Sequence, residues 1–244
     1  MGIPILILGE SGTGKSASMR NFKEDEIALV NVAGKPLPFR GSFDETLDSD
    51  NYRKIKQFIK DCFADVIVID DCQYLMANEF MRRASERGYD KFTEIGVNFW
   101  DLVNSIKELP SNKIVVLMSH IDRDDSGNEK MKTIGKLLDE KINIPGMFTI
   151  VLKTSVKDGR YSFITQNSGH DPVKSPMGMF PAEIDNDLKA AVDTVRNYYF
   201  GSGEPFPTAV EPKIEPSEPK AEPKVEPTEP SEPPKRKRRT RKER

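Results

Sequence analysis

Eight residues near the start of the chain have the types and spacing of a phosphate-binding loop. They read Gly9-Glu10-Ser11-Gly12-Thr13-Gly14-Lys15-Ser16 and fit G-x-x-x-x-G-K-[ST] without a mismatch. Glycines permit backbone angles and close approaches that a side chain would block, so successive N–H groups can face an anion. We expect Gly9 to Ala17 to bind a nucleotide, with the Lys15 ammonium on its β- and γ-phosphates and the Ser16 hydroxyl helping to hold Mg²⁺.

The sequence around this loop has the context that the chemistry requires. The apolar run 3–8 before it predicts a buried strand, and 15–22 after it predicts the start of a helix. Pro4 fits a strand only because it lies at the beginning of the run.

A second set of polar residues follows the apolar run Val66–Ile69. Asp70 comes directly after that run and has the place of a Walker B carboxylate, which would hold the hydration shell of Mg²⁺. Asp71 has two interpretations of equal weight. It could orient or deprotonate the attacking water as a catalytic group, or it could cap the turn that follows the strand.

His120 ends another predicted strand, 113–119, and is a candidate catalytic sensor. A polar side chain there, between the loop strand and the Asp70 strand, would contact the γ-phosphate; the alternative is a solvent-facing histidine. Asn112-Lys113-Ile114-Val115 begins like the guanine motif N-K-x-D but lacks its aspartate. ATP is therefore favoured over GTP.

The predicted elements alternate between strands and helices, which is typical of an α/β fold with a largely parallel sheet. Helices are expected at 50–63, 92–109 and 184–199 and a second strand at 27–32. The runs 148–155 and 161–165 predict a β-hairpin around Asp158-Gly159, a strong turn dipeptide.

Basic side chains gather in two segments that follow predicted strands, where ligands of open α/β sheets bind. The first segment, 78–91, contributes Arg82, Arg83, Arg87 and Lys91; the second, 122–141, contributes Lys130, Lys132 and Lys136. Aromatic residues near these cations would suit single-stranded DNA. Both segments also carry acids, so a solvated surface is the alternative. Lys157 and Arg160 flank the hairpin turn and could act as fingers on a neighbouring subunit's nucleotide, or could be ordinary turn charges.

The last 41 residues differ in composition from the rest. Residues 204–234 hold ten of the eighteen prolines and eight glutamates, which predicts a disordered, extended linker, and eight of the ten residues at 235–244 are basic. The tail would bind polyanions, address the protein to a compartment, contact replication or recombination proteins, or fold back on acidic surface. We expect a globular domain at 1–203, a linker at 204–234 and a basic tail at 235–244.

Charge, cysteines and hydropathy narrow the class of protein. Removing 204–244, with eleven basic and nine acidic residues, leaves 26 basic against 30 acidic, so the globular part carries a net charge of about −4. Cys62 and Cys72 flank a predicted buried strand and are expected to be reduced core residues. No run is long enough to span a membrane and no signal peptide is evident, so we expect a cytoplasmic protein.

The motifs together resemble the phage-encoded RecA/Rad51-like ATPases of the Sak group, associated with single-strand annealing and recombination. The matching pieces are the loop at 9–16, V-I-V-I-D-D at 66–71, M-S-H at 118–120, and the run 161–165 followed by 174–181 and a closing helix. The resemblance implies a RecA-like P-loop core with strand order 5-1-4-3-2, ATP with Mg²⁺, single-stranded DNA as partner, homo-oligomers, and the cytoplasm of a bacterial host. No catalytic glutamate stands beside the loop, so full strand exchange is not expected.

Three functions follow from these patterns. The first is a Mg²⁺-dependent ATPase acting on single-stranded DNA in recombination, annealing or replication. The second is a nucleotide-gated module that binds DNA or protein with little turnover. The third, a small-molecule kinase, requires a lid of arginines that the sequence does not clearly show.

Overall fold

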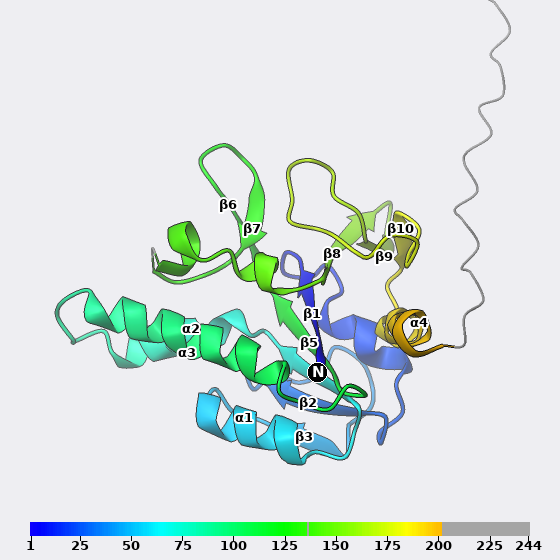
Figure 1. The fold of residues 1–244 in the computed structure, drawn as a ribbon, viewed down its shortest axis with the longest axis horizontal. Helices are drawn as coiled ribbons and strands as arrows, with labels where there is room; N and C mark the ends of the chain where they lie inside the picture. The colour runs from blue at the N-terminus through cyan, green and yellow to red at the C-terminus, as the bar shows by residue number, and fades with distance from the viewer. Residues whose placement is uncertain (136, 202–244) are drawn as a thin grey trace, which may run out of the picture. The chain divides into compact units, whose positions relative to one another are not determined.

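A computed structural model of the chain describes residues 1–135 and 137–201. The predicted Lys136 contact, the linker and the basic tail lie outside the described residues. The described part is an α/β structure with a large, mostly parallel central sheet flanked by helices, as the alternating pattern predicted (Figure 1).

Eight strands form the central sheet, in the order β10-β9-β8-β1-β5-β4-β2-β3. Their bounds are β1 (Ile3–Leu8), β2 (Ile27–Asn31), β3 (Glu45–Leu47), β4 (Val66–Asp70), β5 (Ile114–Ser119), β8 (Ile150–Lys157), β9 (Arg160–Ile164) and β10 (Glu183–Asp185). The strands from β8 to β3 pair in parallel, whereas β9 and β10 pair antiparallel.

This eight-stranded order differs from the predicted five-stranded one, 5-1-4-3-2, which only the strands β8-β1-β5-β4-β2 follow when they are numbered along the chain. The short β3 adds an edge strand beside β2, and β9 and β10 extend the other edge. The run 184–199 was predicted as a continuous helix, but its first residues pair with β9 as β10, so the helix begins only at Leu188. A three-residue strand is too short to produce a period-two pattern, so neither β3 nor β10 was predicted.

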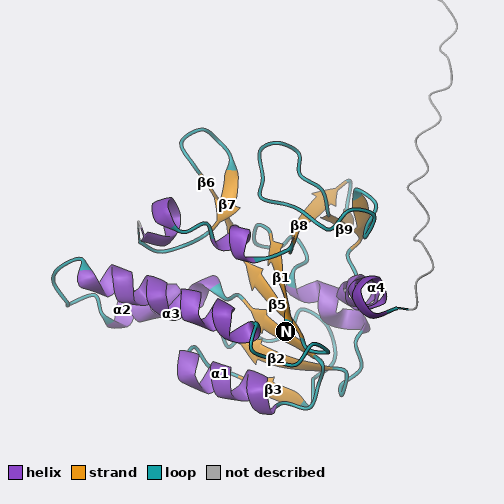
Figure 2. Ribbon diagram, in the orientation of Figure 1, coloured by secondary structure: helices purple, strands orange, loops and turns teal. Residues whose placement is uncertain are grey.

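Helices cover both faces of the sheet (Figure 2). One face packs against α1 (Tyr52–Asp61), α2 (Gln73–Arg82) and α3 (Asp90–Ile106). The other packs against α4 (Leu188–Phe200) and a short 3-10 helix, η1 (Ser16–Asn21), which lies beside α4. The segment after the loop was predicted as a helix start, and only this 3-10 helix forms there.

Alternation along the strands divides the core between the two faces. Leu6 and Leu8 of β1 pack on the side of α1 to α3, whereas Ile5 and Ile7 pack on the side of α4. All four side chains are at most 2% exposed. Each contributes about 1.5–3 kcal/mol of hydrophobic stabilisation, so the strand that carries the glycine-rich loop is firmly fixed.

Two segments expected as loops contain regular structure. Residues 78–91 begin inside α2, whose Leu75 and Met76 are buried against the sheet. The basic segment after β5 forms a small antiparallel pair, β6 (Ile121–Arg123) and β7 (Glu129–Met131), followed by a π-helical turn η2 (Leu137–Lys141) and a 3-10 turn η3 (Ile144–Met147). The few apolar residues of each segment left no clear period in the sequence.

The hairpin around Asp158-Gly159 forms between β8 and β9 as predicted. Both turn residues have positive φ, 52° and 76°, the combination that a two-residue type I′ turn requires. None of the helices in the described ranges is long and apolar enough to cross a membrane.

Candidate functional site

The predicted chemical residues meet at one edge of the sheet. Leu8, Asn31, Asp70 and Ser119 end β1, β2, β4 and β5, and parallel pairing brings those ends to the same edge. β5 lies between β1 and β4. Ligands of parallel α/β sheets bind at this carboxyl edge, so the fold gathers the loop, the carboxylates and His120 where a ligand would be expected.

The conformation of the glycine-rich loop depends on its glycines. A Cβ on Gly9 would lie 1.8 Å from Thr154 Oγ1 of β8, so a larger residue cannot fit without displacing the loop. Gly14 has φ +93°, and a Cβ there would lie 2.9 Å from the Tyr161 ring. Thr13 Oγ1 donates to Glu10 O at 2.7 Å and lies 2.6 Å from Thr154 Oγ1, which ties the loop to β8.

Lys15 is almost fully buried at the base of this loop, with 6% exposure. Its ammonium donates to Gly9 O at 2.9 Å and to Glu10 O at 2.8 Å. Burial lowers the pKa of Lys15 below its usual value, against the opposing attraction of Asp71 and Asp70. A cation desolvated in this way is poised to interact strongly with an anion that enters the site.

Ser16 and Asp70 form a hydroxyl–carboxylate pair suited to a magnesium ion. Ser16 Oγ donates to Asp70 Oδ2 at 2.6 Å, while Asp70 Oδ1 is buried without a hydrogen-bond partner. Burial raises the pKa of Asp70 above its usual value. Mg²⁺ retains several waters and needs only one or two protein oxygens beside substrate phosphates, so an unpaired carboxylate oxygen next to a serine hydroxyl fits this ion.

Asp71 is held in an unusual backbone conformation, with φ 57° in the left-handed region. Its Oδ2 lies 2.7 Å from Lys35 Nζ, and its Oδ1 lies 3.3 Å from His120 Nε2 and accepts from Gln73 Nε2 at 3.4 Å. Burial alone would raise the pKa of Asp71, but the hydrogen bond and charge of Lys35 outweigh it and the pKa falls. Asp71 therefore stays ionised and points into the site.

His120 lies between Asp71 and the aromatic side chain of Tyr74. Its backbone N–H donates to Gln73 Oε1 at 3.2 Å, and its ring meets Tyr74 edge-on at 6.3 Å. Burial, followed by the positive charge of Lys15, lowers the pKa of His120. The imidazole is consequently neutral at physiological pH, when one ring nitrogen can donate a hydrogen bond and the other can accept one.

A cavity of about 360 Å³ opens over these groups. Its lining includes the predicted residues Ser11, Gly12, Gly14, Lys15, Ser16, Ala17, Asp70, Asp71 and His120. It also includes Lys35, Pro36, Leu37 and Pro38, which follow β2, and Tyr161 of β9. Sequence reasoning missed these residues. Lys35 carried a usable signal, because it follows a strand predicted to end at the ligand edge of the sheet.

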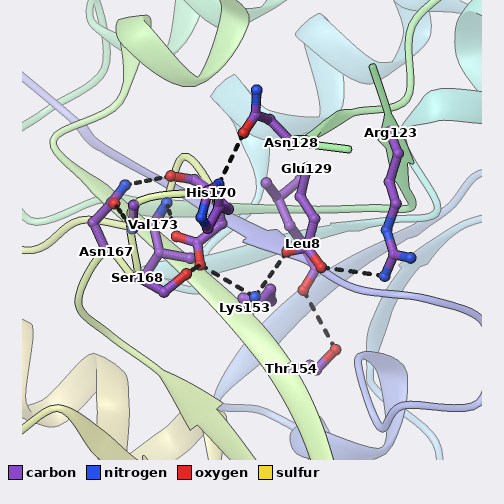
Figure 3. Close-up of polar contacts among 12 residues, drawn as sticks. Leu8, Arg123, Asn128, Glu129, Lys153, Thr154, Asn167, Ser168, His170 and Val173 are labelled. Carbon is purple, nitrogen blue, oxygen red and sulfur yellow. Dashed lines mark hydrogen bonds and ion pairs between the residues drawn. The ribbon is translucent and has the colours of Figure 1, made fainter. Parts of the chain in front are cut away.

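The β6–β7 hairpin stands next to the loop and is bound to β8 through charged groups (Figure 3). Arg123 Nη2 lies 3.6 Å from both Glu10 Oε1 and Glu129 Oε1. Glu129 Oε2 in turn accepts from Lys153 Nζ at 2.7 Å, and Lys153 also contacts Asp171 at 3.2 Å. Arg123 was not among the predicted site residues, although it belongs to the basic segment that was singled out.

The structure gives different surroundings to the cations that were predicted to bind DNA. Arg83 pairs with Glu79, Glu86 and Glu94, and buried Lys91 donates to the Arg83 and Glu86 carbonyls, so both stabilise the α2–α3 connection. Arg82 pairs with Asp50 at 2.5 Å, and Arg87 is exposed. On the second segment, Lys132 lines a shallow hollow beside the loop together with Arg123, and Lys130 lies in β7.

The two finger candidates lie at the tip of the β8–β9 hairpin. Arg160 pairs with Asp185 of the same chain at 2.9 Å, and both side chains are more than 70% exposed. Lys157 stands opposite Arg160 in the register of the hairpin and is also exposed. Both side chains are therefore exposed at this turn.

No protein-family model and no curated protein matches this chain. Across residues 1–135 and 137–201, no group of three or more histidine, cysteine or acidic side chains is placed to hold a metal ion. The arrangement at the cavity therefore carries the functional argument: a cationic, glycine-lined loop faces two carboxylates, one of which has an unpaired oxygen.

Proposed function

We propose that the chain is a RecA-like P-loop ATPase that binds ATP with Mg²⁺ and hydrolyses it. One observation carries the proposal: the motif's Lys15 and Ser16 share a cavity with Asp70 and Asp71. Ser16 and Asp70 are already in contact at 2.6 Å although 54 residues separate them in the sequence. That contact is unnecessary for a glycine turn with an incidental lysine, and it is expected of a phosphate and metal site.

The side chains of the cavity supply positioning and charge. Lys15 would move from the loop carbonyls to the phosphates, and the loop N–H groups would bind phosphate oxygens. Mg²⁺, held through Ser16 and Asp70, would neutralise charge on the β- and γ-phosphate oxygens. Asp71 would accept the proton of the attacking water. The single N–H of the neutral His120 ring would hold Asp71 until phosphate binds and would then donate toward the phosphate.

We prefer ATP to GTP because the guanine motif N-K-x-D at 112–115 lacks its aspartate. The position of Lys113, the lysine of this incomplete motif, supports the preference. Lys113 lies at the amino end of β5, opposite the cavity, and is buried. Its ammonium donates to Cys62 O at 2.9 Å and Ala64 O at 2.7 Å. Lys113 therefore stabilises the segment that follows α1. It lies at the end of β5 away from the cavity, where it cannot contact a nucleotide base.

We further propose single-stranded DNA as the partner, bound by the β6–β7 hairpin. Arg123, Lys130 and Lys132 place three cations on this hairpin and the residue after it. Arg123 also contacts Glu10 of the loop, so a ligand on the hairpin would be felt at the nucleotide. Deleting 204–244 tests whether DNA affinity and its salt dependence reside in the described domain or in the tail.

A nucleotide-gated binding module with little turnover is the second candidate. The favouring observation is that both oxygens of Asp71 are engaged, by Lys35 on one side and by His120 and Gln73 on the other. A carboxylate held in this way does not deprotonate water until one of these contacts is released. The two candidates share the binding site and differ only in turnover.

Calorimetric titration of ATP with and without Mg²⁺ tests the binding step. Lys15→Ala should weaken binding by about 10- to 100-fold, because charge-assisted contacts of about 1.5–3 kcal/mol are lost. Lys60→Ala, on the exposed face of α1, is the matched control and should bind as the wild type does. Equal affinity in the Lys15→Ala variant and the wild type would contradict the proposal.

A further inference from the structure

Lys35 is a second cation at the cavity, and nothing in the loop motif accounts for it. It follows β2, the strand next to β4, in the segment 33–38. Its ammonium lies 2.7 Å from Asp71 Oδ2 and 5.2 Å from the centre of the Tyr74 ring. The Lys35 side chain is 59% exposed and that of Asp71 only 11%. The lysine thus covers the carboxylate from the open side.

This ion pair occupies the oxygen that Asp71 would need as a base. Asp71 Oδ1 is engaged by both His120 and the buried Gln73, so Oδ2 is the oxygen that a water would have to reach. Lys35 sits directly on it. While this contact lasts, Asp71 has no oxygen available to accept a proton from water.

Lys15 and Lys35 line the same cavity from the segments that follow β1 and β2, and the positive charge of Lys35 adds to the burial that lowers the pKa of Lys15. A nucleoside triphosphate adds a terminal phosphate that a diphosphate lacks, and with it further negative charge. The existing ion pair is weak because Lys35 is largely in solvent. A phosphate offers more negative charge and more acceptor oxygens than a carboxylate does. The terminal phosphate is therefore able to compete with Asp71 for Lys35.

We propose, building on the nucleotide hydrolysis inferred above, that Lys35 exchanges its partner from Asp71 to the terminal phosphate of a bound triphosphate. The exchange does two things at once. It adds a cation to the phosphate, and it frees Asp71 Oδ2 to act. A water oxygen then bonds to the γ-phosphorus as the bond from that phosphorus to the β,γ-bridging oxygen breaks, and the water's proton passes to Asp71. The diphosphate leaves with the bridging oxygen.

The structure of Lys35 suits such an exchange. Its four-carbon stem is flexible, and its side chain is largely in solvent. Asp71, in contrast, is fixed by its left-handed backbone and by its contacts to His120 and Gln73. The mobile member of the pair is therefore the lysine. A diphosphate would leave the pair intact, so the site would distinguish nucleotide states through one side chain.

The test compares affinities for a non-hydrolysable triphosphate, AMP-PNP, with those for ADP, both with Mg²⁺, by calorimetry. Lys35→Met removes the charge. Lys35→Gln also removes the charge but keeps an amide that can donate to Asp71. It therefore replaces Lys35→Met in the test if the methionine variant does not fold. Lys35→Arg retains the charge, and Lys60→Met on α1 is the matched control. Steady-state ATP hydrolysis is measured on the same proteins.

Neutralising Lys35 should lower AMP-PNP affinity about 10-fold relative to ADP and should reduce turnover. Lys35→Arg should restore much of both, and Lys60→Met should change neither. If AMP-PNP and ADP affinities shift by the same factor, or not at all, the partner exchange is wrong while nucleotide binding stands. If the wild type binds neither nucleotide, the proposed function fails and this inference fails with it.

Discussion

Asp70 gives the clearest test of whether the site is built for a ligand at the expense of stability. The residue is 8% exposed, and its Oδ1 is buried without a hydrogen-bond partner. An unsatisfied buried polar group costs about 1–3 kcal/mol, and more when it is charged. Asp70→Asn removes the charge and should therefore stabilise the ligand-free protein by about 1–2 kcal/mol. For a domain of this size that raises the Tm by about 2–8 °C.

The pH dependence of this gain follows from the direction of the pKa shift. Burial raises the pKa of Asp70 above its unfolded value, so its protonated form favours folding and its ionised form opposes it. The contribution to stability is complete below the ordinary carboxyl pKa and is lost as pH rises through the raised value. Asp70→Asn should therefore exceed the wild type in stability at pH 7 and approach it in acid.

Ser16→Ala is the matched variant, and its effect should have the opposite sign. It removes the 2.6 Å hydrogen bond to Oδ2 and leaves the carboxylate with less support, which costs about 1–3 kcal/mol. Both variants should lose the extra thermal stabilisation that Mg²⁺ adds to ATP. Thermal melts at neutral and acidic pH measure all of these effects. A lower Tm for Asp70→Asn than for the wild type at pH 7 would refute the reasoning.

Three further predictions concern stability. Gly9→Ala should lower the stability by about 1–3 kcal/mol because the new Cβ would lie 1.8 Å from Thr154 Oγ1. In melting curves, this loss of stability should be smaller in a Thr154→Ala background. It should be undiminished in a Thr154→Ser background, which keeps the oxygen. Lys113→Met should cost about 3 kcal/mol in urea titration, since buried carbonyls at Cys62 and Ala64 lose their donor. Burial would raise the pKa of Asp171, but its hydrogen bonds outweigh burial and lower the pKa. The ionised carboxylate therefore stabilises the fold above the ordinary carboxyl pKa, and this stabilisation is lost as the pH falls through the lowered pKa. Asp171→Asn should be less stable than the wild type at pH 7 and should converge with it in strong acid.

The longer strands and three of the four α-helices in the described residues could be predicted because their patterns are strong. The runs at 3–8, 66–69 and 114–119 are continuous and apolar, and all are buried at the centre of the sheet. Helix α3 was predicted to within a few residues at each end. Helix α2 was not predicted, because it has few buried apolar residues and ends in a charged connection. Short edge strands carry too few residues to show a period.

At the site, motif residues could be named from the sequence but their partners could not. The pattern at 9–16 identified Lys15 and Ser16, and the end of β4 identified Asp70. Lys35 belongs to no motif, and only the pairing of β2 with β4 brings it to Asp71. Arg83 and Lys91 show the converse, since a charged residue in a sequence does not reveal the internal carboxylates or carbonyls that engage it.

The most direct measurement is steady-state ATP hydrolysis with Mg²⁺, with and without single-stranded DNA, using Lys15→Ala as the blank. We predict turnover that rises when DNA is added and that is absent from the Lys15→Ala protein. Turnover that persists in Lys15→Ala would contradict the assignment of the loop, and the absence of turnover despite tight ATP binding would replace the ATPase with the nucleotide-gated module.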